Sequence, residues 1–297
     1  MILLTGATGF VGRNLFKRML KANLSVRCLV RTHKKGEALK SYGAGVELVT
    51  GDITDKESLK NAMEDIKIVV HLVGIIVETG KAAFDLIHVH GTKNMVEAAV
   101  EAGAQRFIHM SALGARPDAR SRYHMTKWAA EEIVRNSGMK YAIFRPSVIF
   151  GKEDNFTNMF AKAVKISPFV MVPGNGRNMM QPVSVNDVAE VFTIAVKDDN
   201  FKGSYELGGT EKLTFDEIID KICYVLGRKR MKVHIPLSLL NPMAWVMESV
   251  LPKPPLTRDQ LLMLQEDNVT RDNALEQVFG IKPGRFEDGI REYLVGG

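Results

Sequence analysis

The chain has 297 residues, of which 45% are apolar and 25% charged, which is typical of a soluble globular protein with one large α/β domain and an added lobe, or with two modest domains. Its two cysteines, Cys28 and Cys223, lie outside any CxxC spacing, which argues against a disulfide framework or a thiolate zinc site and favours a reducing compartment. The net charge of +6 suits an anionic ligand or membrane surface, but the basic residues are scattered and no nucleic-acid-binding motif occurs, so no nucleic-acid partner is expected.

Short apolar runs alternate with helical patterns through the first half of the chain. We expect β-strands at residues 1–5, 25–31, 45–50, 66–73, 106–111 and 141–146. Helices are expected between them, after residue 10, from about Lys56, at 83–102 and at 121–137. This alternation predicts a Rossmann-type α/β fold with a doubly wound parallel sheet. A strand that starts at Ile2 leaves no room for a targeting peptide, so a cytoplasmic location is expected.

The alternation ends after Pro146. Residues 181–196 indicate one more strand that leads into a helix. Thr214 and Glu217 have the spacing of a capping box at the start of an amphipathic helix. Helical pieces interrupted by prolines are expected over 231–297.

Three glycines stand between the first strand and the first helix, in the sequence TGATGFVG. Gly6 allows a sharp turn, Gly9 leaves the backbone open to a pyrophosphate, and Gly12 lets the helix approach the sheet. A strand, a glycine turn and a helix N-terminus together favour a dinucleotide phosphate site over a turn without a ligand, although the spacing is GxxGxxG rather than GxGxxG.

The division of the chain follows from this turn. We expect an NAD(P)-binding Rossmann domain at 1–150, to which 181–200 returns. Residues 151–180 and 201–297 are expected to form a smaller C-terminal lobe that closes over it.

The end of the second strand indicates which dinucleotide is bound. Arg31, Lys34 and Lys35 follow that strand. No carboxylate occurs before Glu37, and Arg13 offers a further guanidinium. An acidic residue at this place would hold a ribose 2′-hydroxyl, whereas arginine accommodates a 2′-phosphate. The pattern favours NADP(H) over NAD(H), the alternative being that the lysines are solvated surface charges.

Tyr123 and Lys127 lie four residues apart on the helix expected after the fifth strand. An ammonium one turn away favours the phenolate, so we expect a lowered tyrosine pKa and a proton-transfer pair. The YxxxK spacing alone is weak, and its position in the chain makes it informative.

Several motifs occur in one order: TGATGFVG, GDITD, HLVG, YHMTK, FRPSVIFG, VSVNDVAE and GSYELGG. In these motifs the chain resembles the extended or atypical branch of the short-chain dehydrogenase/reductase superfamily, with its NAD-dependent epimerases and dehydratases. It is most similar to the group that includes the 39-kDa NAD(P)H-binding accessory subunit of respiratory complex I and relatives in quinone biosynthesis and photosystem assembly. The resemblance covers nearly the whole length.

The resemblance implies a set of cofactor-binding residues. The pyrophosphate would be lined by Gly6, Thr8, Gly9, Phe10 and Val11. The adenosine would be met by Arg31 and Lys35 at its 2′ position and by Asp52 and Ile53 at the adenine edge. At the nicotinamide half, the resemblance implies that the ribose lies along Val73 and Gly74. Tyr123 and Lys127 would contact the same ribose and would form the catalytic pair. The carboxamide would lie near Pro146 and Val148.

Two departures from the pattern concern catalysis. The family's catalytic Ser or Thr aligns with Ala112, one residue after Ser111, and strand alternation would then aim Ser111 elsewhere unless the strand has ended. His88 replaces the asparagine common before the GT of the preceding helix. Ser111 is therefore a doubtful third catalytic residue.

Three other features of the sequence have both a functional and a structural interpretation. His88 and His90 lack a third ligand, so no metal site is predicted and a structural or solvent-facing role is favoured. The apolar segment 235–255 is too short to span a bilayer and suits a membrane surface, a protein partner, a lid or lobe core. Flexible or aromatic side chains near the expected cleft suit a hydrophobic ligand or ordinary packing: Met159, Phe160, Met171, Met179 and Met180.

Three functions follow from these patterns. The first is an NADP(H)-dependent oxidoreductase, epimerase or dehydratase acting on an unidentified carbonyl or hydroxyl group. The second is a non-catalytic NADP(H)-binding accessory or assembly protein of a respiratory or quinone-related complex, in which 235–255 meets a membrane or a protein. The third is a regulator that senses the NADPH/NADP⁺ ratio. The intact YxxxK spacing favours the first, while Ala112 and His88 favour the second.

Overall fold

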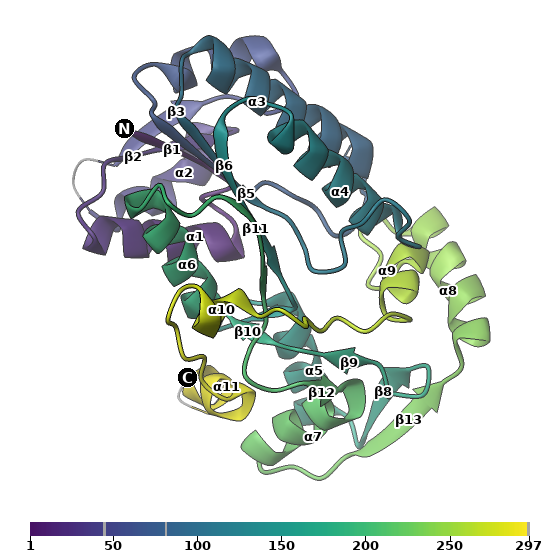
Figure 1. Ribbon diagram of the computed structural model, residues 1–297. Helices are drawn as coiled ribbons and strands as arrows, with labels where there is room; N and C mark the ends of the chain where they lie inside the picture. Colours follow the sequence, from purple (N-terminus) through teal and green to yellow (C-terminus); the bar gives the residue numbers. More distant parts are fainter. Residues whose placement is uncertain (44–45, 81, 296–297) are drawn as a thin grey trace. The chain divides into compact units, whose positions relative to one another are not determined.

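The buried apolar runs of the first half form one seven-stranded sheet in the computed structural model, which describes residues 1–43, 46–80 and 82–295 (Figure 1). The strand order is β3-β2-β1-β4-β5-β6-β11, and neighbours from β3 to β6 run parallel. The strands are β1 Ile2–Thr5, β2 Val26–Val30, β3 Glu47–Thr50, β4 Ile68–His71, β5 Arg106–Met110, β6 Lys140–Pro146 and β11 Gly203–Leu207. The predicted Rossmann-type fold is confirmed.

Helices follow the strands of this sheet. They are α1 Phe10–Lys21, α2 His33–Lys40, the 3₁₀ helices η1 Lys56–Leu59 and η2 Asn61–Met63, the π-helical η3 Asp85–His90, α3 Gly91–Glu101 and α4 Arg122–Arg135. Apolar residues of the strands, of α3 and of α4 form a shared core, which includes Phe107, Met95 and Val134. The helix expected at 83–102 thus starts as a π-helical turn, and the one expected from Lys56 is 3₁₀.

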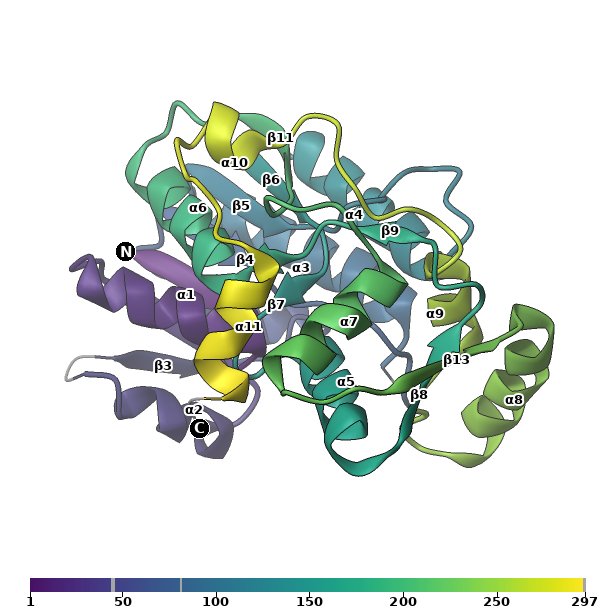
Figure 2. The same ribbon diagram turned by 90° about the horizontal axis from the view of Figure 1, so that it is seen from below.

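The chain divides into two compact units. The first comprises residues 1–145 and 188–205, and the second 146–187 and 206–297. The returning segment of the first unit lies mainly in α6 Val185–Lys197, beside α1 (Figures 1 and 2). Arg18 on α1 pairs with Glu190 on α6 at 2.9 Å. The buried Arg106 donates to the carbonyl of Asp198 at 2.7 Å, and thereby holds the end of the returning segment against β5.

The second unit has its own core and three small sheets. Its strands are β7 Ile149–Phe150 paired with β10 Val183–Ser184, β9 Met179–Met180 paired with β12 Leu213–Thr214, and β8 Phe169–Pro173 paired with β13 Met231–Ile235. Its helices are α5 Asn155–Ile166, α7 Phe215–Val225, α8 Leu237–Val250, α9 Arg258–Met263, α10 Ala274–Gln277 and α11 Phe286–Leu294. Both α5 and α11 lie beside α7 (Figure 2). Side chains such as Phe160, Ile218 and Ile290 fill the core between them.

Two sequence expectations for this unit have definite outcomes. The capping box is present, because Thr214 accepts from the Glu217 N–H and the Glu217 carboxylate accepts from the Thr214 N–H. The helical pieces expected over 231–297 are present from α8 to α11, but the strand β13 at the start of this range, which pairs in parallel with β8, was not predicted. Its short run of alternating residues, MKVHI, is a strand signal that the prolines after it obscured. Gly45, the first residue of one expected strand, and residues 296–297 lie outside the described residues.

The close approach at Gly12 generates a stability prediction. A Cβ at this position would lie 2.0 Å from the Gly6 carbonyl oxygen and 2.8 Å from the Ala7 Cα. Both contacts are backbone atoms that cannot swing away. We expect Gly12→Ala to lower the free energy of unfolding by about 2 kcal/mol or more, measured by urea denaturation.

The matched control is Gly284→Ala. A Cβ on Gly284 meets no heavy atom within 4 Å. We expect a change within about 0.5 kcal/mol there. Equal stabilities of the two variants would contradict a tight contact at Gly12.

Candidate functional site

The glycine turn begins where β1 ends. Gly6 has φ +76°, a left-handed conformation that favours glycine, and its carbonyl accepts from the Gly9 N–H at 2.9 Å. Gly9 is the N-cap of α1 and makes no side-chain cap. Thr8 and Gly9 are exposed, whereas Val11 is buried, so position 11 offers its backbone rather than its side chain. Phe10, the first residue of α1, is half-buried. The turn is a backbone cradle at a helix N-terminus, which suits an anion.

A second loop lies against this turn. A Cβ on Gly6 would lie 3.3 Å from the Val73 nitrogen and from Leu72, which directly follow β4. The chain order of the sheet reverses between β1 and β4, and ligands of such sheets bind outside the carboxyl ends of the strands at this reversal. The structure therefore brings together the predicted residues Gly6, Val73 and Gly74.

The predicted adenosine residues follow β2 and β3. Arg31 comes directly after β2 and is exposed, and Lys35 is exposed in α2. The Asp52 carboxylate accepts from the Thr54 N–H and hydroxyl, each at 2.9 Å. Ile53 is buried in the core. Because β1, β2 and β3 are parallel neighbours, these residues share the sheet edge that carries the glycine turn.

Tyr123 and Lys127 both lie on α4, which begins after its N-cap Ser121. Lys127 is buried, and its Nζ donates to the Met110 carbonyl at 2.5 Å. A Cβ on Gly74 would lie 3.9 Å from this Nζ, so the ammonium reaches the loop after β4. The half-buried Tyr123 ring packs edge-on against the His88 ring, with centroids 5.6 Å apart.

The electrostatics of this pair differ from the expectation. Burial raises the pKa of Tyr123 to about 12. Burial also lowers the pKa of Lys127 to about 8, although the neighbouring Glu131 carboxylate opposes this shift. The predicted lowering of the tyrosine pKa was therefore wrong, because burial disfavours the charged phenolate. At neutral pH Tyr123 is a phenol and Lys127 is mostly charged.

His88 connects the loop after β4 with α4. Its Nε2 accepts from the Ile75 N–H at 3.0 Å, which places the ring proton on Nδ1. Nδ1 therefore donates to the Thr126 hydroxyl at 2.9 Å. That hydroxyl in turn donates a hydrogen bond to the Arg122 carbonyl at 2.9 Å. Both ring nitrogens are thus used within the protein, while His90 is exposed.

Two more buried histidines, His71 and His109, were missed by the sequence analysis. They face each other on β4 and β5, with rings stacked at 5.6 Å. His71 Nδ1 lies 2.8 Å from the Thr5 hydroxyl, whereas neither His109 nitrogen has a hydrogen-bond partner among the described residues. Burial and the Lys127 charge lower the pKa of His71 to about 3 and that of His109 well below its usual range. A histidine at the same place in two neighbouring strands was the available signal.

The strand ladder decides the direction of Ser111. The Ser111 N–H donates to the Phe144 carbonyl at 2.7 Å, so pairing with β6 continues one residue past Met110. Alternation then places Ser111 on the face of Phe107, whose core α3 and α4 share. Its hydroxyl is buried without a partner among the described residues, and Ala112 supplies no hydroxyl. A catalytic role for Ser111 stays a prediction.

The remaining predicted residues belong to the second unit. Pro146 ends β6, and the Val148 N–H donates to the Asn268 side-chain oxygen at 3.2 Å. The same oxygen accepts from the Ser147 hydroxyl at 2.6 Å, so Asn268 holds this segment. No sequence pattern pointed to Asn268. Of the residues noted near the expected cleft, Phe160 and Met180 are core, Met179 is half-buried, and Met159 and Met171 are exposed.

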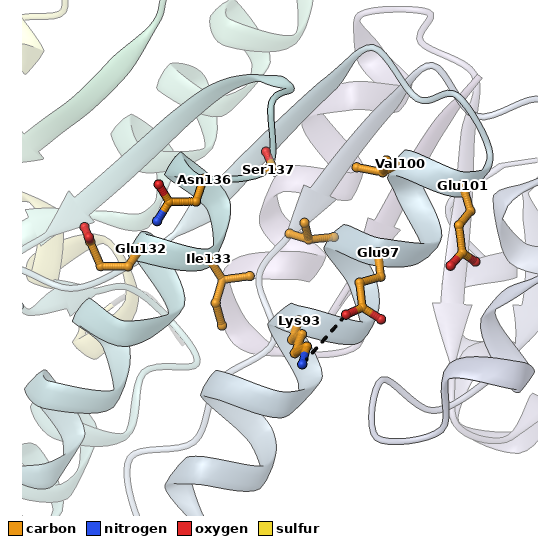
Figure 3. Close-up of a pocket in the computed structure, with 9 residues that line it drawn as sticks. Lys93, Glu97, Val100, Glu101, Glu132, Ile133, Asn136 and Ser137 are labelled. Atoms are coloured by element: carbon orange, nitrogen blue, oxygen red, sulfur yellow. Dashed lines mark ion pairs between the residues drawn. The ribbon is translucent and has the colours of Figure 1, made fainter.

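A groove of about 520 Å³ lies elsewhere on the first unit, between α3 and α4 (Figure 3). Figure 3 shows Lys93 paired with Glu97 in this groove, which Val96 and Ile133 also line. None of its lining residues is one of the predicted site residues. The groove therefore adds nothing to the site at the strand ends.

The buried histidines predict a pH dependence of stability. The pKa of His71 and of His88 is about 3 in the folded chain, against an ordinary 6.5. Between these values the unfolded chain binds more protons, so the free energy of unfolding falls as the pH drops below about 6.5. We expect His88→Asn to reduce the slope by about 1.4 kcal/mol per pH unit, measured by urea denaturation between pH 6 and 4.

The exposed His90 provides the control, because His90→Asn should leave this slope unchanged. A slope that stays the same in His88→Asn would show that His88 is protonated without cost in the folded protein. Lys127 affects the free energy of unfolding in a separate pH range. Its lowered pKa makes stability rise with pH from about 8 upwards.

Comparisons with known proteins extend over the whole chain. It is 31% identical to subunit 9 of the NADH dehydrogenase (ubiquinone) 1 alpha subcomplex from Arabidopsis thaliana mitochondria, covering 98% of this chain and 76% of the relative. It is 30% identical to a ceramide reductase of Caulobacter vibrioides, covering 80% and 74%. Among the described residues, no helix is long and apolar enough to cross a membrane.

Solved structures share the fold. A triphenylmethane reductase of Citrobacter superimposes with a TM-score of 0.81 at 20% identity, covering 99% of both chains. The UDP-glucose 4-epimerase of Thermus thermophilus, solved with NAD, gives 0.74 at 20% identity, covering 100% and 99%. The NmrA-like family model matches residues 1–293, and the chain therefore belongs to the NmrA-like family, whose relatives include the complex I subunit that the sequence motifs resemble.

Proposed function

We propose that the protein binds NADP(H) and acts as a reductase on a carbonyl substrate. The observation that carries this proposal is the backbone cradle at Gly6, Gly9 and Gly12, which stands at the reversal of strand order. A side chain at Gly12 would overlap the Gly6 carbonyl, so the turn is built for a close backbone approach. The NAD held by the structurally similar epimerase supports the same class of ligand.

The charge after β2 supports the phosphorylated form of the dinucleotide. Arg31 is exposed at the edge shared with the glycine turn, and Lys35 follows one helical turn later. Between residues 31 and 36 no carboxylate is present that would repel a 2′-phosphate. A guanidinium can hold such a phosphate through two parallel hydrogen bonds.

Tyr123 and Lys127 carry the proton chemistry in this proposal. A bound nicotinamide would supply the hydride. Tyr123 is protonated at neutral pH and donates its phenolic proton to the substrate oxygen. Lys127 presents its ammonium at Gly74, and would hold the ribose hydroxyls. His88 links the loop at Ile75 to α4, because its ring hydrogen-bonds to the Ile75 N–H and to the Thr126 hydroxyl.

The second candidate is a non-catalytic NADP(H)-binding accessory protein. Ala112 at the position of the family's hydroxyl favours this role, because an oxyanion would lack its usual donor there. The similarity to a respiratory complex subunit supports the same role, with a protein complex as partner.

Binding is tested by calorimetry with NADPH and NADH. We expect NADPH to bind at least about tenfold more tightly, because Arg31 pairs with the 2′-phosphate. Arg31→Gln should remove most of this preference while leaving NADH affinity unchanged. Lys40→Gln, an exposed cation at the far end of α2, should change neither affinity. Absence of binding to both dinucleotides would refute the proposal.

The two candidates are separated by Tyr123→Phe. In a reductase this change should lower kcat at least about a hundredfold at unchanged NADPH affinity, because the proton donor is lost. The measurement is NADPH oxidation with a panel of aldehydes and ketones. If the wild-type protein binds NADPH but oxidises it with no member of the panel, the accessory role is favoured. Full turnover by Tyr123→Phe would exclude Tyr123 as the acid.

A further inference from the structure

Helix α8 in the second unit has two apolar faces. One face carries Leu240 and Ala244, which are buried against Leu261 and the partly buried Ile235 and Leu256. This contact accounts for the folding of the helix onto its unit. The exposed apolar flank beside it is therefore not needed for the core.

One exposed flank of the helix carries a continuous stripe of apolar side chains. It consists of Leu239, Met243, Val246 and Val250, which are between 51% and 72% exposed. The steps of four, three and four residues place them on one side of the helix. Trp245 is also exposed, to 55%, but it lies on another side of the helix. Such a row is unusual on a surface in contact only with water.

A second exposed apolar patch adjoins this stripe in the chain. In the β8–β13 pair, Met231 lies opposite Phe169 and Val233 opposite Met171. All four side chains are exposed, whereas Val170 is in the core. Because alternation separates the two faces of a strand, these four share the outer face of the pair. Only Pro236 separates β13 from α8.

The two patches together contain eight residues, which we call the outer apolar face: Phe169, Met171, Met231, Val233, Leu239, Met243, Val246 and Val250. The charges along this part of the chain are mostly basic, although Lys232 on β13 pairs with Asp220 at 2.7 Å. Residues 228–258 contain six basic residues and one acidic residue. The acidic one, Glu248, is held by Arg258 at 2.7 Å. The exposed Arg228, Lys229 and Lys253 stand at the two ends of the segment.

We propose that the outer apolar face docks on the surface of a membrane that contains anionic lipids. An interfacial helix combines an apolar face that enters the acyl boundary with basic residues that meet lipid phosphates, and both are present here. The helix has 14 residues, about 21 Å at 1.5 Å per residue, and so lies on a bilayer rather than crossing it.

A lipid surface fits these residues better than a protein partner. The outer apolar face consists of methionine, leucine, valine and phenylalanine side chains, and within α8 the charged Glu248 already has its partner. A specific protein interface would carry polar groups that fix its register. The cations at both ends provide the charge complementarity for an anionic lipid surface. This proposal does not depend on dinucleotide binding.

The experiment is sedimentation of the full chain with vesicles of phosphatidylcholine, with and without phosphatidylglycerol. We expect binding to the anionic vesicles and at least about tenfold weaker binding to the neutral ones. The double variant Leu239→Ser with Val246→Ser should weaken binding at least about tenfold, because it removes apolar contact area. Lys229→Gln and Lys253→Gln should each weaken it about fivefold and reduce its salt dependence.

Matched controls and a second readout keep the outcomes distinct. Val278→Ser and Lys282→Gln alter exposed residues outside the outer apolar face and should leave vesicle binding unchanged. Thermal unfolding should show that the double variant is folded, since its changed residues are exposed. Absence of binding to anionic vesicles, or equal binding by the double variant, would overturn the proposal. So would a stable oligomer in sedimentation velocity that the double variant abolishes, because the face would then be a contact between copies.

Discussion

The contact between Gly12 and the Gly6 carbonyl is the constraint on which the candidate site depends. It lets the first turn of α1 rest directly on the turn that leaves β1. That contact sets the direction of the helix N-terminus and leaves its backbone N–H groups facing the strand ends. The loop after β4 then packs against Gly6, so that the place where the strand order reverses becomes a backbone surface suited to a phosphate.

Behind this surface the first unit contains a cluster of buried polar side chains. Lys127 is charged at neutral pH and is surrounded by histidines that burial keeps neutral. Such a group is costly to bury, and it persists where hydrogen bonds compensate it, as with the Met110 carbonyl. Both nitrogens of His88 are hydrogen-bonded, whereas the His109 nitrogens and the Ser111 hydroxyl have no such partner in the part of the chain that the structure describes. Burial of these groups thus lowers the stability of the fold, but it keeps the Lys127 ammonium at the strand ends. Such a loss of stability is typical of functional sites.

The second unit separates two kinds of apolar surface. The core around α7 is closed by α5 and α11 and needs no further partner. The outer apolar face remains exposed although α8 is already anchored by Leu240 and Ala244. One face of α8 therefore packs into the unit, while another face of the same helix is available for contact with a different surface. Substitutions on the outer apolar face can then alter association without disturbing the core.

The sequence by itself determined the α/β fold, the glycine turn and the capped helix at Thr214. These features are written in neighbouring residues, as apolar periodicity, glycine spacing and capping pairs, and they need no distant contact to be read. Only the tertiary structure decided the strand β13, because the prolines after it gave a misleading local signal and its pairing with β8 spans 62 positions from Phe169 to Met231. It also decided the protonation of Tyr123 and the grouping of His71, His109 and Lys127. The pKa of a side chain depends on how much water the whole fold removes from it, and that quantity is set by strand register and helix packing between residues far apart in the chain.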